Sequence, residues 1–153
     1  MPIRLAEAAD VPAVERIVEN AYARWVGPVG RRPVPMDDDY TAKVAGGQVH
    51  VLEDGGRVVG LIVLLEAEDH LLIENVAVAP GCQGRGFGRE LLAFADETAA
   101  AHGLGELRLY THEKMESNIE LYRRLGWVEV ERAEQDRFRR VFFAKRLGLQ
   151  SSR

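Results

Sequence analysis

The chain has 153 residues, of which 46% are hydrophobic and 29% charged, and its formal net charge is −4. This length fits one domain over residues 1–153 with its own core, and the negative charge argues against a nucleic-acid binder that relies on general phosphate attraction. Because Cys82 is the only cysteine and the apolar runs are too short for a leader or a membrane span, we expect a protein of the reducing cytoplasm.

The first third of the chain predicts a short strand followed by two helices. Residues 3–5 read as a strand, and Asp10 is a good helix N-cap residue. Apolar residues then recur at helical spacing as far as Trp25. The stretch 27–35 is rich in Gly and Pro and predicts a loop, and residues 37–45 predict a second, shorter helix.

Three strands follow. Residues 48–53 alternate between apolar and polar, and Asp54-Gly55-Gly56 suits a tight hairpin turn. Residues 57–65 are apolar almost throughout, as in a strand covered on both faces. Residues 71–78 form another apolar run, interrupted by Glu74 and Asn75.

The remaining elements complete a single α/β domain. A helix continues through Leu91 and ends at Gly103, and residues 106–111 predict a strand. A helix begins at or near Ser117 and ends before Gly126, which suits a left-handed cap. Residues 127–131 and 138–145 predict two closing strands.

The sequence APGCQGRGFGREL, residues 79–91, stands at the junction of an apolar strand and a helix. The first N–H groups of a helix have no internal partner and the helix dipole is positive there, so a phosphate is a natural ligand. Glycines let such a ligand approach the main chain closely. A plain tight turn without a ligand is the alternative.

The common nucleotide motifs are absent from this stretch. The P-loop pattern needs Gly-Lys followed by Ser or Thr, which the chain lacks here. In the dinucleotide pattern G-x-G-x-x-G the third glycine would stand at Arg89. A binder of ATP or NAD is therefore the weakest of the readings.

The run VAVAPGCQGRGFG resembles the motif Q/R-x-x-G-x-G/A of the GNAT superfamily of N-acetyltransferases, with Gln83, Gly86 and Gly88 at its fixed positions. LYRRLGW, residues 121–127, resembles the second motif of that family, L-Y-x-x-x-G-F/W. The order of elements agrees over nearly the whole chain. The resemblance implies a single-domain α/β fold with a mixed, mostly antiparallel sheet of about six to seven strands and about four helices.

By this resemblance the cofactor is acetyl-CoA, used as a cosubstrate, and no metal is involved. The turn would hold the pyrophosphate, and the strand before it would pair its main chain with the pantetheine arm. Many members also carry an Asn seven residues before the motif tyrosine, where this chain has Met115, and Asn118 is the substitute that we expect. The cofactor residues expected in this way are Val76, Ala77, Val78, Gln83, Gly84, Arg85, Gly86, Phe87, Gly88, Arg89 and Asn118.

The chemistry implied by the resemblance needs a base for the acceptor amine, whose ordinary pKa is about 10.4, and an acid for the leaving thiolate. Tyr122 matches the tyrosine of the family and is the expected acid. Glu74, a carboxylate inside an apolar strand, is the first candidate for the base. His112, Tyr110 and a chain of water molecules are the alternatives.

The first two helices and their loop should form the wall of the acceptor pocket in a fold of this family. Tyr22, Trp25, Arg31 and Tyr40 are the side chains expected to contact the acceptor. Arg31 and Arg32 suggest an acceptor with a carboxylate, whereas the acidic run 37–39 suggests a cationic one. A solvated loop with scattered charges is the third interpretation, and all three stay open.

The leading hypothesis is transfer of an acetyl group from acetyl-CoA to a primary amine of a small molecule or a peptide. The alternative is a module that senses acyl-CoA without catalysis. We expect neither nucleic acid nor membrane as a partner, and the resemblance also allows a homodimer.

Overall fold

The computed structural model describes residues 2–148. The strands are β1 (Ile3–Leu5), β2 (Val49–Asp54), β3 (Arg57–Glu66), β4 (Leu71–Val78), β5 (Glu106–His112), β6 (Val128–Gln135) and β7 (Phe138–Arg146). The helices are α1 (Val11–Tyr22), α2 (Val26–Val29), α3 (Tyr40–Ala45), α4 (Phe87–Ala101) and α5 (Glu116–Arg124), with short 3-10 turns between some of them.

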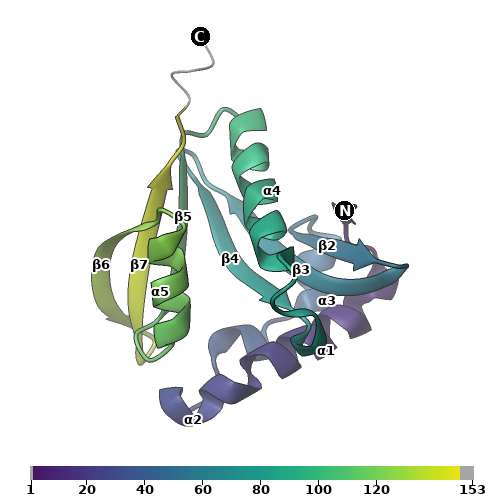
Figure 1. The fold of residues 1–153 in the computed structure, drawn as a ribbon, viewed down its shortest axis with the longest axis horizontal. Helices are drawn as coiled ribbons and strands as arrows, with labels where there is room; N and C mark the ends of the chain where they lie inside the picture. Colours follow the sequence, from purple (N-terminus) through teal and green to yellow (C-terminus); the bar gives the residue numbers. More distant parts are fainter. Residues whose placement is uncertain (1, 149–153) are drawn as a thin grey trace.

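All of these strands belong to one seven-stranded sheet in the order β1-β2-β3-β4-β5-β7-β6 (Figure 1). Every neighbouring pair is antiparallel except β4 and β5, which are parallel. The predicted fold class is therefore confirmed: the sheet is mixed and mostly antiparallel, and α1, α3, α4 and α5 are its main helices.

Helices cover both faces of the sheet, and each face has its own apolar core. On one face, α1 and α3 pack on the central strands through residues such as Val14, Val18 and Val44. On the other face, α4 and α5 pack through residues such as Leu91 and Ile119. Strands β3 and β4 lie between these cores, which explains why their sequences are apolar on both faces.

The sheet divides between β4 and β5. The parallel pairing extends only from Leu71↔Leu107 to Ile73↔Leu109, and Figure 1 shows the two strands separating beyond that point. The register of β4 against β3 also shifts there, because Val63 pairs with Asn75 and Leu64 with Ile73. Glu74 is thus the extra residue of a β-bulge, which bends a strand and redirects its side chains.

Several predicted boundaries were wrong around the first helices. The loop predicted over 27–35 includes most of α2, because Pro28 in a first turn lacks only an N–H that would be unpaired anyway. The helix predicted to run to Trp25 ends at Tyr22 and continues as a 3-10 turn. The second helix begins only at Tyr40.

Asp10 is the N-cap of α1, as predicted, but its side chain does not cap the helix. The Asp10 side chain makes no cap hydrogen bond to α1. Its carboxylate accepts hydrogen bonds from the Arg4 guanidinium (2.8 and 3.1 Å) and from the backbone N–H of Glu7 (2.7 Å). The arginine guanidinium therefore competes successfully with the helix N-terminus for this carboxylate.

Other turns follow the sequence closely. Gly55 and Gly56 join β2 to β3 with φ of 63° and 80°, as the predicted hairpin requires. Gly126 has φ of 95° and follows Leu125, the C-cap of α5. Within residues 2–148, no helix is long and apolar enough to cross a membrane.

Candidate active site

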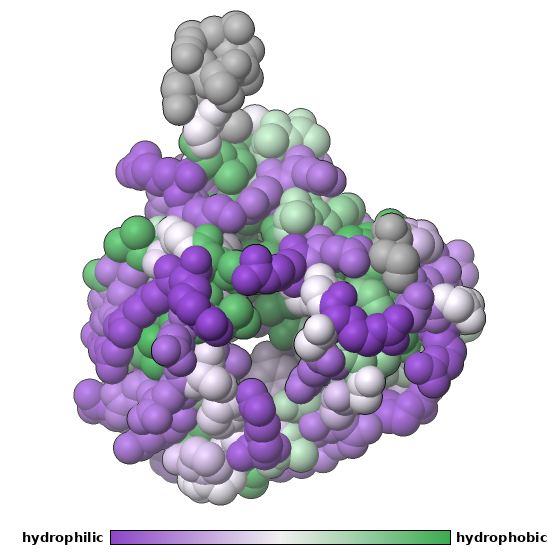
Figure 2. Space-filling view, in the orientation of Figure 1, coloured by the Kyte–Doolittle hydropathy of each residue, from purple (hydrophilic) through white to green (hydrophobic). Residues whose placement is uncertain are grey.

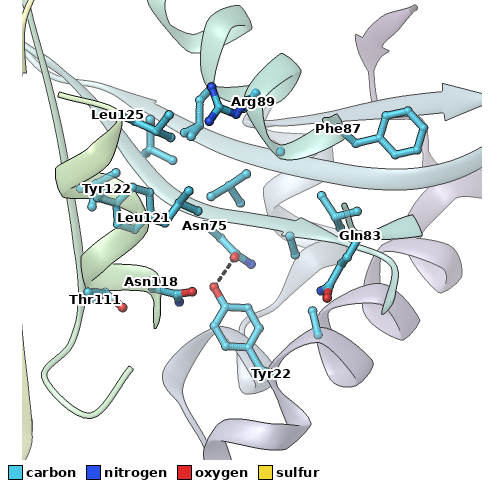
Figure 3. Close-up of a pocket in the computed structure, with 18 of the residues that line it drawn as sticks. Tyr22, Asn75, Gln83, Phe87, Arg89, Thr111, Asn118, Leu121, Tyr122 and Leu125 are labelled. Carbon is cyan, nitrogen blue, oxygen red and sulfur yellow. Dashed lines mark hydrogen bonds between the residues drawn. The ribbon is translucent and has the colours of Figure 1, made fainter. Parts of the chain in front are cut away.

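A cavity of about 300 Å³ opens where β4 and β5 separate. Figure 2 shows this face hollowed near its middle, with apolar residues in the hollow and hydrophilic residues around the rim. The lining comes from α1, β4, the glycine turn, α4, β5 and α5 (Figure 3). Side chains from distant parts of the chain therefore share one space.

The glycine turn forms one end of the cavity and is shaped as an anion cradle. Gly84 and Gly86 have φ of 83° and 85°, in the left-handed region that favours glycine. Gly86 is the N-cap of α4, so the N–H groups of Phe87 and Gly88 are directed away from the helix without an intrahelical acceptor. Together with the helix dipole, these N–H groups favour a negatively charged ligand at this end.

The two arginines of the turn differ in position. Arg89 lines the cavity, together with Gln83, Gly84, Gly86, Phe87 and Gly88. Arg85 does not; its guanidinium pairs with Asp54 at 3.2 Å and lies 4.9 Å from the centre of the Phe87 ring. The geometry therefore brings Arg89 to the cavity and leaves Arg85 at its outer side.

Strand β4 offers main-chain groups to the cavity. Val76, Ala77 and Val78 pair with β3 on one side, but the pairing with β5 on the other side ends at Ile73. All of Val76, Ala77 and Val78 line the cavity. Their backbone N–H and C=O groups on the β5 side are thus available to an extended ligand, as an added strand would use them.

Tyr122 lines the cavity from α5, and the side chain is 9% exposed. Its ring packs edge-on against Trp127 and tilted against Phe143, with ring centres 6.2 and 5.8 Å apart. Burial raises the pKa of its hydroxyl to about 12. The hydroxyl is therefore a protonated group held against the cavity wall by aromatic packing.

Asn118, one turn earlier on α5, also lines the cavity. Its amide nitrogen lies 3.7 Å from the sulfur of Met115, and the hydroxyl of Thr111 lies 3.2 Å from the same sulfur. Met115 is buried and is the N-cap of α5, without a side-chain cap hydrogen bond. Of Asn118 and Met115, only Asn118 lines this cavity.

The bulge places Glu74 at the point where the sheet divides. The carboxylate accepts a hydrogen bond from Lys43 of α3 over 2.7 Å, and both side chains are about one-fifth exposed. Glu74 lines the cavity and also a smaller hollow of about 60 Å³ on the side of α2 and β7. A single carboxylate is therefore accessible from two spaces.

The smaller hollow shares four residues with the main cavity, namely Tyr22, Glu74, Tyr110 and Thr111. Its other walls are mostly apolar, and they include Pro33, Pro35 and Phe138. His112 and Arg140 add polar groups. The two hollows thus meet at the division of the sheet, where a ligand in one could contact a ligand in the other.

His112 is less suited to act as a base than Glu74 in this arrangement. Its Nδ1 accepts a hydrogen bond from the backbone N–H of Lys114 (3.0 Å), which places the proton of a neutral ring on Nε2. Burial lowers the pKa of the ring. The neutral ring then has no free lone pair with which to accept a proton.

A hydrogen-bonded chain that the sequence did not predict runs behind the cavity. The Tyr22 hydroxyl donates to Asn75 Oδ1 (2.6 Å), Asn75 Nδ2 donates to the Tyr40 oxygen (2.9 Å), and the Tyr40 hydroxyl donates to the carbonyl of Pro35 (2.6 Å). Figure 3 shows Tyr22 directed towards Asn75 at the cavity. Asn75 is 3% exposed, and a buried polar residue in an apolar strand was the signal that could have identified it.

The four side chains expected at the acceptor differ in whether they line the two hollows. Tyr22 lines both hollows, and Trp25 lines the main cavity only. Arg31 lies over Phe138, with its guanidinium carbon 5.1 Å from the ring centre, and does not line the hollow. Tyr40 is buried within the hydrogen-bonded chain, and burial raises the pKa of its hydroxyl.

Two further residues also line the cavity: Arg24, which follows the first helix and belongs to the expected pocket wall, and Thr111, which the sequence analysis missed. Arg24 lines the main cavity, and its guanidinium donates to the Ser117 hydroxyl over 3.3 Å, which links the end of α1 to α5. Thr111 lines both hollows from β5. Nothing in its local sequence distinguished Thr111 from other strand residues.

The divided sheet, the glycine turn and the cavity between them agree with the fold that the two sequence motifs imply. The chain belongs to the acetyltransferase (GNAT) family, whose family model matches residues 14–127. The resemblance seen in the two sequence motifs is therefore confirmed.

Streptothricin acetyltransferase of Streptomyces lavendulae is 40% identical to this chain over 58 residues, which are 38% of this chain and 31% of that protein. N-alpha-acetyltransferase 80 of Mus musculus is 38% identical over 63 residues, which are 41% of this chain and 20% of that protein. The match thus spans under a third of either relative. Among solved structures, this chain is similar to the PaiA N-acetyltransferase of Thermoplasma acidophilum, crystallised in complex with coenzyme A. The two chains are 14% identical in sequence and superpose with a TM-score of 0.79, over 95% of this chain and 98% of that chain.

Proposed function

We propose that this protein transfers the acetyl group of acetyl-CoA directly to a primary amine. The observation that carries the proposal is the meeting of two hollows at Glu74, one with an anion cradle and one with apolar walls. A cofactor in the first hollow and an amine in the second would approach each other where β4 and β5 separate. Such an arrangement turns a reaction between two molecules into one within a single complex.

The groups that line the main cavity suit the charge and the main-chain hydrogen-bonding groups of acetyl-CoA. The N–H groups at Phe87 and Gly88 and the guanidinium of Arg89 suit its pyrophosphate. The unpaired edge of β4 at Val76 and Val78 suits the amides of its pantetheine arm. The family neighbour with bound coenzyme A supports this choice of cofactor.

The reaction would proceed by direct attack of the neutral amine on the thioester carbonyl. Glu74, alone or through water, takes the proton that the ammonium must lose. Backbone N–H groups of β4 beyond the bulge stabilise the oxyanion of the tetrahedral intermediate. Tyr122 then donates a proton to the leaving thiolate, for which its protonated state at neutral pH is suited.

The acceptor hollow favours an amine on an apolar body. Pro33, Pro35 and Phe138 give it apolar walls, while Glu74 gives it a carboxylate that attracts a cation. One of the two curated relatives is named for acetylating streptothricin and the other for N-alpha-acetylation. We therefore propose a small molecule or a peptide N-terminus as the acceptor.

A module that senses acyl-CoA without catalysis is the second candidate. The observation that favours it is the ion pair between Lys43 and Glu74, because a carboxylate that already holds an ammonium group is less available as a base. Release of free thiol in the presence of an acceptor separates the two functions.

The first experiment is thermal unfolding with acetyl-CoA, CoA, ATP and NAD in separate samples. A ligand at about 100 times its Kd stabilises the native state by about 2.7 kcal/mol, which raises the midpoint by several degrees in a chain of this size. We expect a rise with acetyl-CoA and CoA only, followed by thiol release with a panel of amines. No rise with either form of CoA would contradict the proposal.

A further inference from the structure

A lysine of the chain itself is already hydrogen-bonded to the candidate base, Glu74. Lys43 Nζ lies 2.7 Å from Glu74 Oε1, at hydrogen-bond distance. Glu74 in turn lines both the cofactor cavity and the acceptor hollow. The ammonium group of Lys43 therefore has the contact that the ammonium group of an external acceptor needs before it loses its proton.

The surroundings of Lys43 hold its ammonium in place. Burial acts to lower its pKa, but the hydrogen bond to Glu74 and the charges of Glu74 and Asp38 outweigh burial and raise it. The titratable groups that influence it are on three elements: Glu74 on β4, Asp38 before α3 and Tyr110 on β5. An ammonium in such an environment reacts slowly with an acyl donor in solution, since only the neutral amine is a nucleophile.

We propose that Lys43 is an internal acceptor, which the protein acetylates with its own bound acetyl-CoA. This inference rests on the proposed function, because it uses the same cofactor and base. The proton of Lys43 passes to Glu74, the neutral Nζ forms a bond to the acetyl carbon, the carbon–sulfur bond breaks, and CoA leaves as the thiol after protonation. The four-carbon stem of a lysine gives Nζ the freedom to turn from the carboxylate towards the thioester.

Acetylation of Lys43 would change the site in a definite way. An acetylated lysine carries no charge, so the ion pair with Glu74 is lost. Glu74 then becomes free to receive the ammonium group of an external acceptor. Self-acetylation would in this way prime the site for its acceptor, and unmodified Lys43 would compete with that acceptor.

The chain offers matched controls for this modification. Its lysines are Lys43, Lys114 and Lys145. Lys145 forms a similar ion pair with Asp96 (2.8 Å), and its side chain is 25% exposed against 19% for Lys43. Neither lysine lines a hollow itself, but the partner of Lys43, Glu74, lines both hollows, whereas the partner of Lys145, Asp96, lines neither. Lys145 therefore reports on acetylation without the site.

The experiment incubates the purified protein with acetyl-CoA and follows the acetyl group by intact mass and by peptide mapping. We expect Lys43 to be modified faster than Lys145 and Lys114, with a rate constant independent of protein concentration. The variant Lys43→Arg keeps a cation beside Glu74 and should lose the modification. Tyr122→Phe should slow it about 100-fold, as loss of a general acid does.

The outcomes separate this inference from the proposed function. Thiol release with an external amine, but no acetyl group on Lys43, would overturn self-acetylation and leave the transferase function intact. Equal labelling of Lys43 and Lys145, or labelling that persists in Tyr122→Phe, would also overturn it, because chemical acetylation would then explain the result. If acetyl-CoA gives no thermal shift, the proposed function and this inference fail together.

Discussion

Replacing Tyr122 by Phe removes one hydroxyl and little else. The ring keeps its packing against Trp127 and Phe143, and among residues 2–148 no hydrogen-bond partner of that hydroxyl is found. A swap that conserves volume at such a position costs less than about 1.5 kcal/mol of unfolding free energy. The thermal midpoint and its rise with CoA should therefore stay nearly unchanged.

Turnover should respond very differently. General acid catalysis contributes about 10²- to 10⁴-fold, or about 3 to 5 kcal/mol of activation free energy. We expect kcat of Tyr122→Phe to fall in that range, measured as thiol release with acetyl-CoA and the best acceptor of the amine panel.

The pH dependence provides a second test of the same role. Burial holds the pKa of Tyr122 at about 12, so the wild-type hydroxyl stays protonated through neutral and mildly alkaline pH. A thiol has an ordinary pKa of about 8.5, so its thiolate needs less help to leave as the pH rises above that value. The defect of Tyr122→Phe should therefore narrow at alkaline pH. A kcat within about threefold of wild type at neutral pH would refute the assignment of Tyr122 as the acid.

Three further predictions concern the cradle, the buried chain and pH. Gly88→Ala should raise the unfolding free energy by about 0.5–1 kcal/mol, since a Cβ there meets only Val78 Cγ2 at 4.0 Å. The same substitution should weaken the binding of CoA about tenfold in a titration. An unchanged affinity would argue against close contact of a ligand with the cradle. Asn75→Ala should lower the free energy of unfolding in urea by about 2–4 kcal/mol, because it removes two hydrogen bonds and leaves the Tyr22 hydroxyl without its acceptor. A loss under about 1 kcal/mol would contradict the importance of this hydrogen-bonded chain. Burial lowers the pKa of His50 below 6.5, so the unfolded state binds a proton at His50 first and the free energy of unfolding falls as the pH drops below 6.5. His50→Gln should therefore lose less stability than the wild type over that range. Parallel curves of unfolding midpoint against pH for the two proteins would disprove this.

The candidate cofactor site could be predicted largely from local sequence. Gly86 and Gly88 belong to one short segment in which strand, turn and helix N-terminus follow directly, so chain order alone fixes their proximity. Tyr122 belongs to a second local motif, and its position beside the cavity follows from the family pattern. The outward position of Arg85 could not be predicted, because it depends on Asp54, 31 residues away in the chain.

Two of the residues expected at the acceptor lie outside the smaller hollow for a related reason. Arg31 and Tyr40 were chosen from their place in the first loop and helices, but neither lines the hollow. The hollow depends instead on β5 and β7, which bring Thr111 and Phe138 to it from far along the chain. Loop composition does not reveal which distant strand a loop will face.

By itself, the sequence determined the order of elements, the apolar strands of the centre, the hairpin at Gly55-Gly56 and the anion cradle, because hydrophobic periodicity and glycine φ angles act over a few residues. Only the tertiary structure decided where the sheet divides, that Glu74 occupies a bulge, and that Lys43 from α3 meets its carboxylate. Those features arise from strand register and from packing between distant elements. Contacts of that kind are set by the whole chain at once, so no local pattern encodes them.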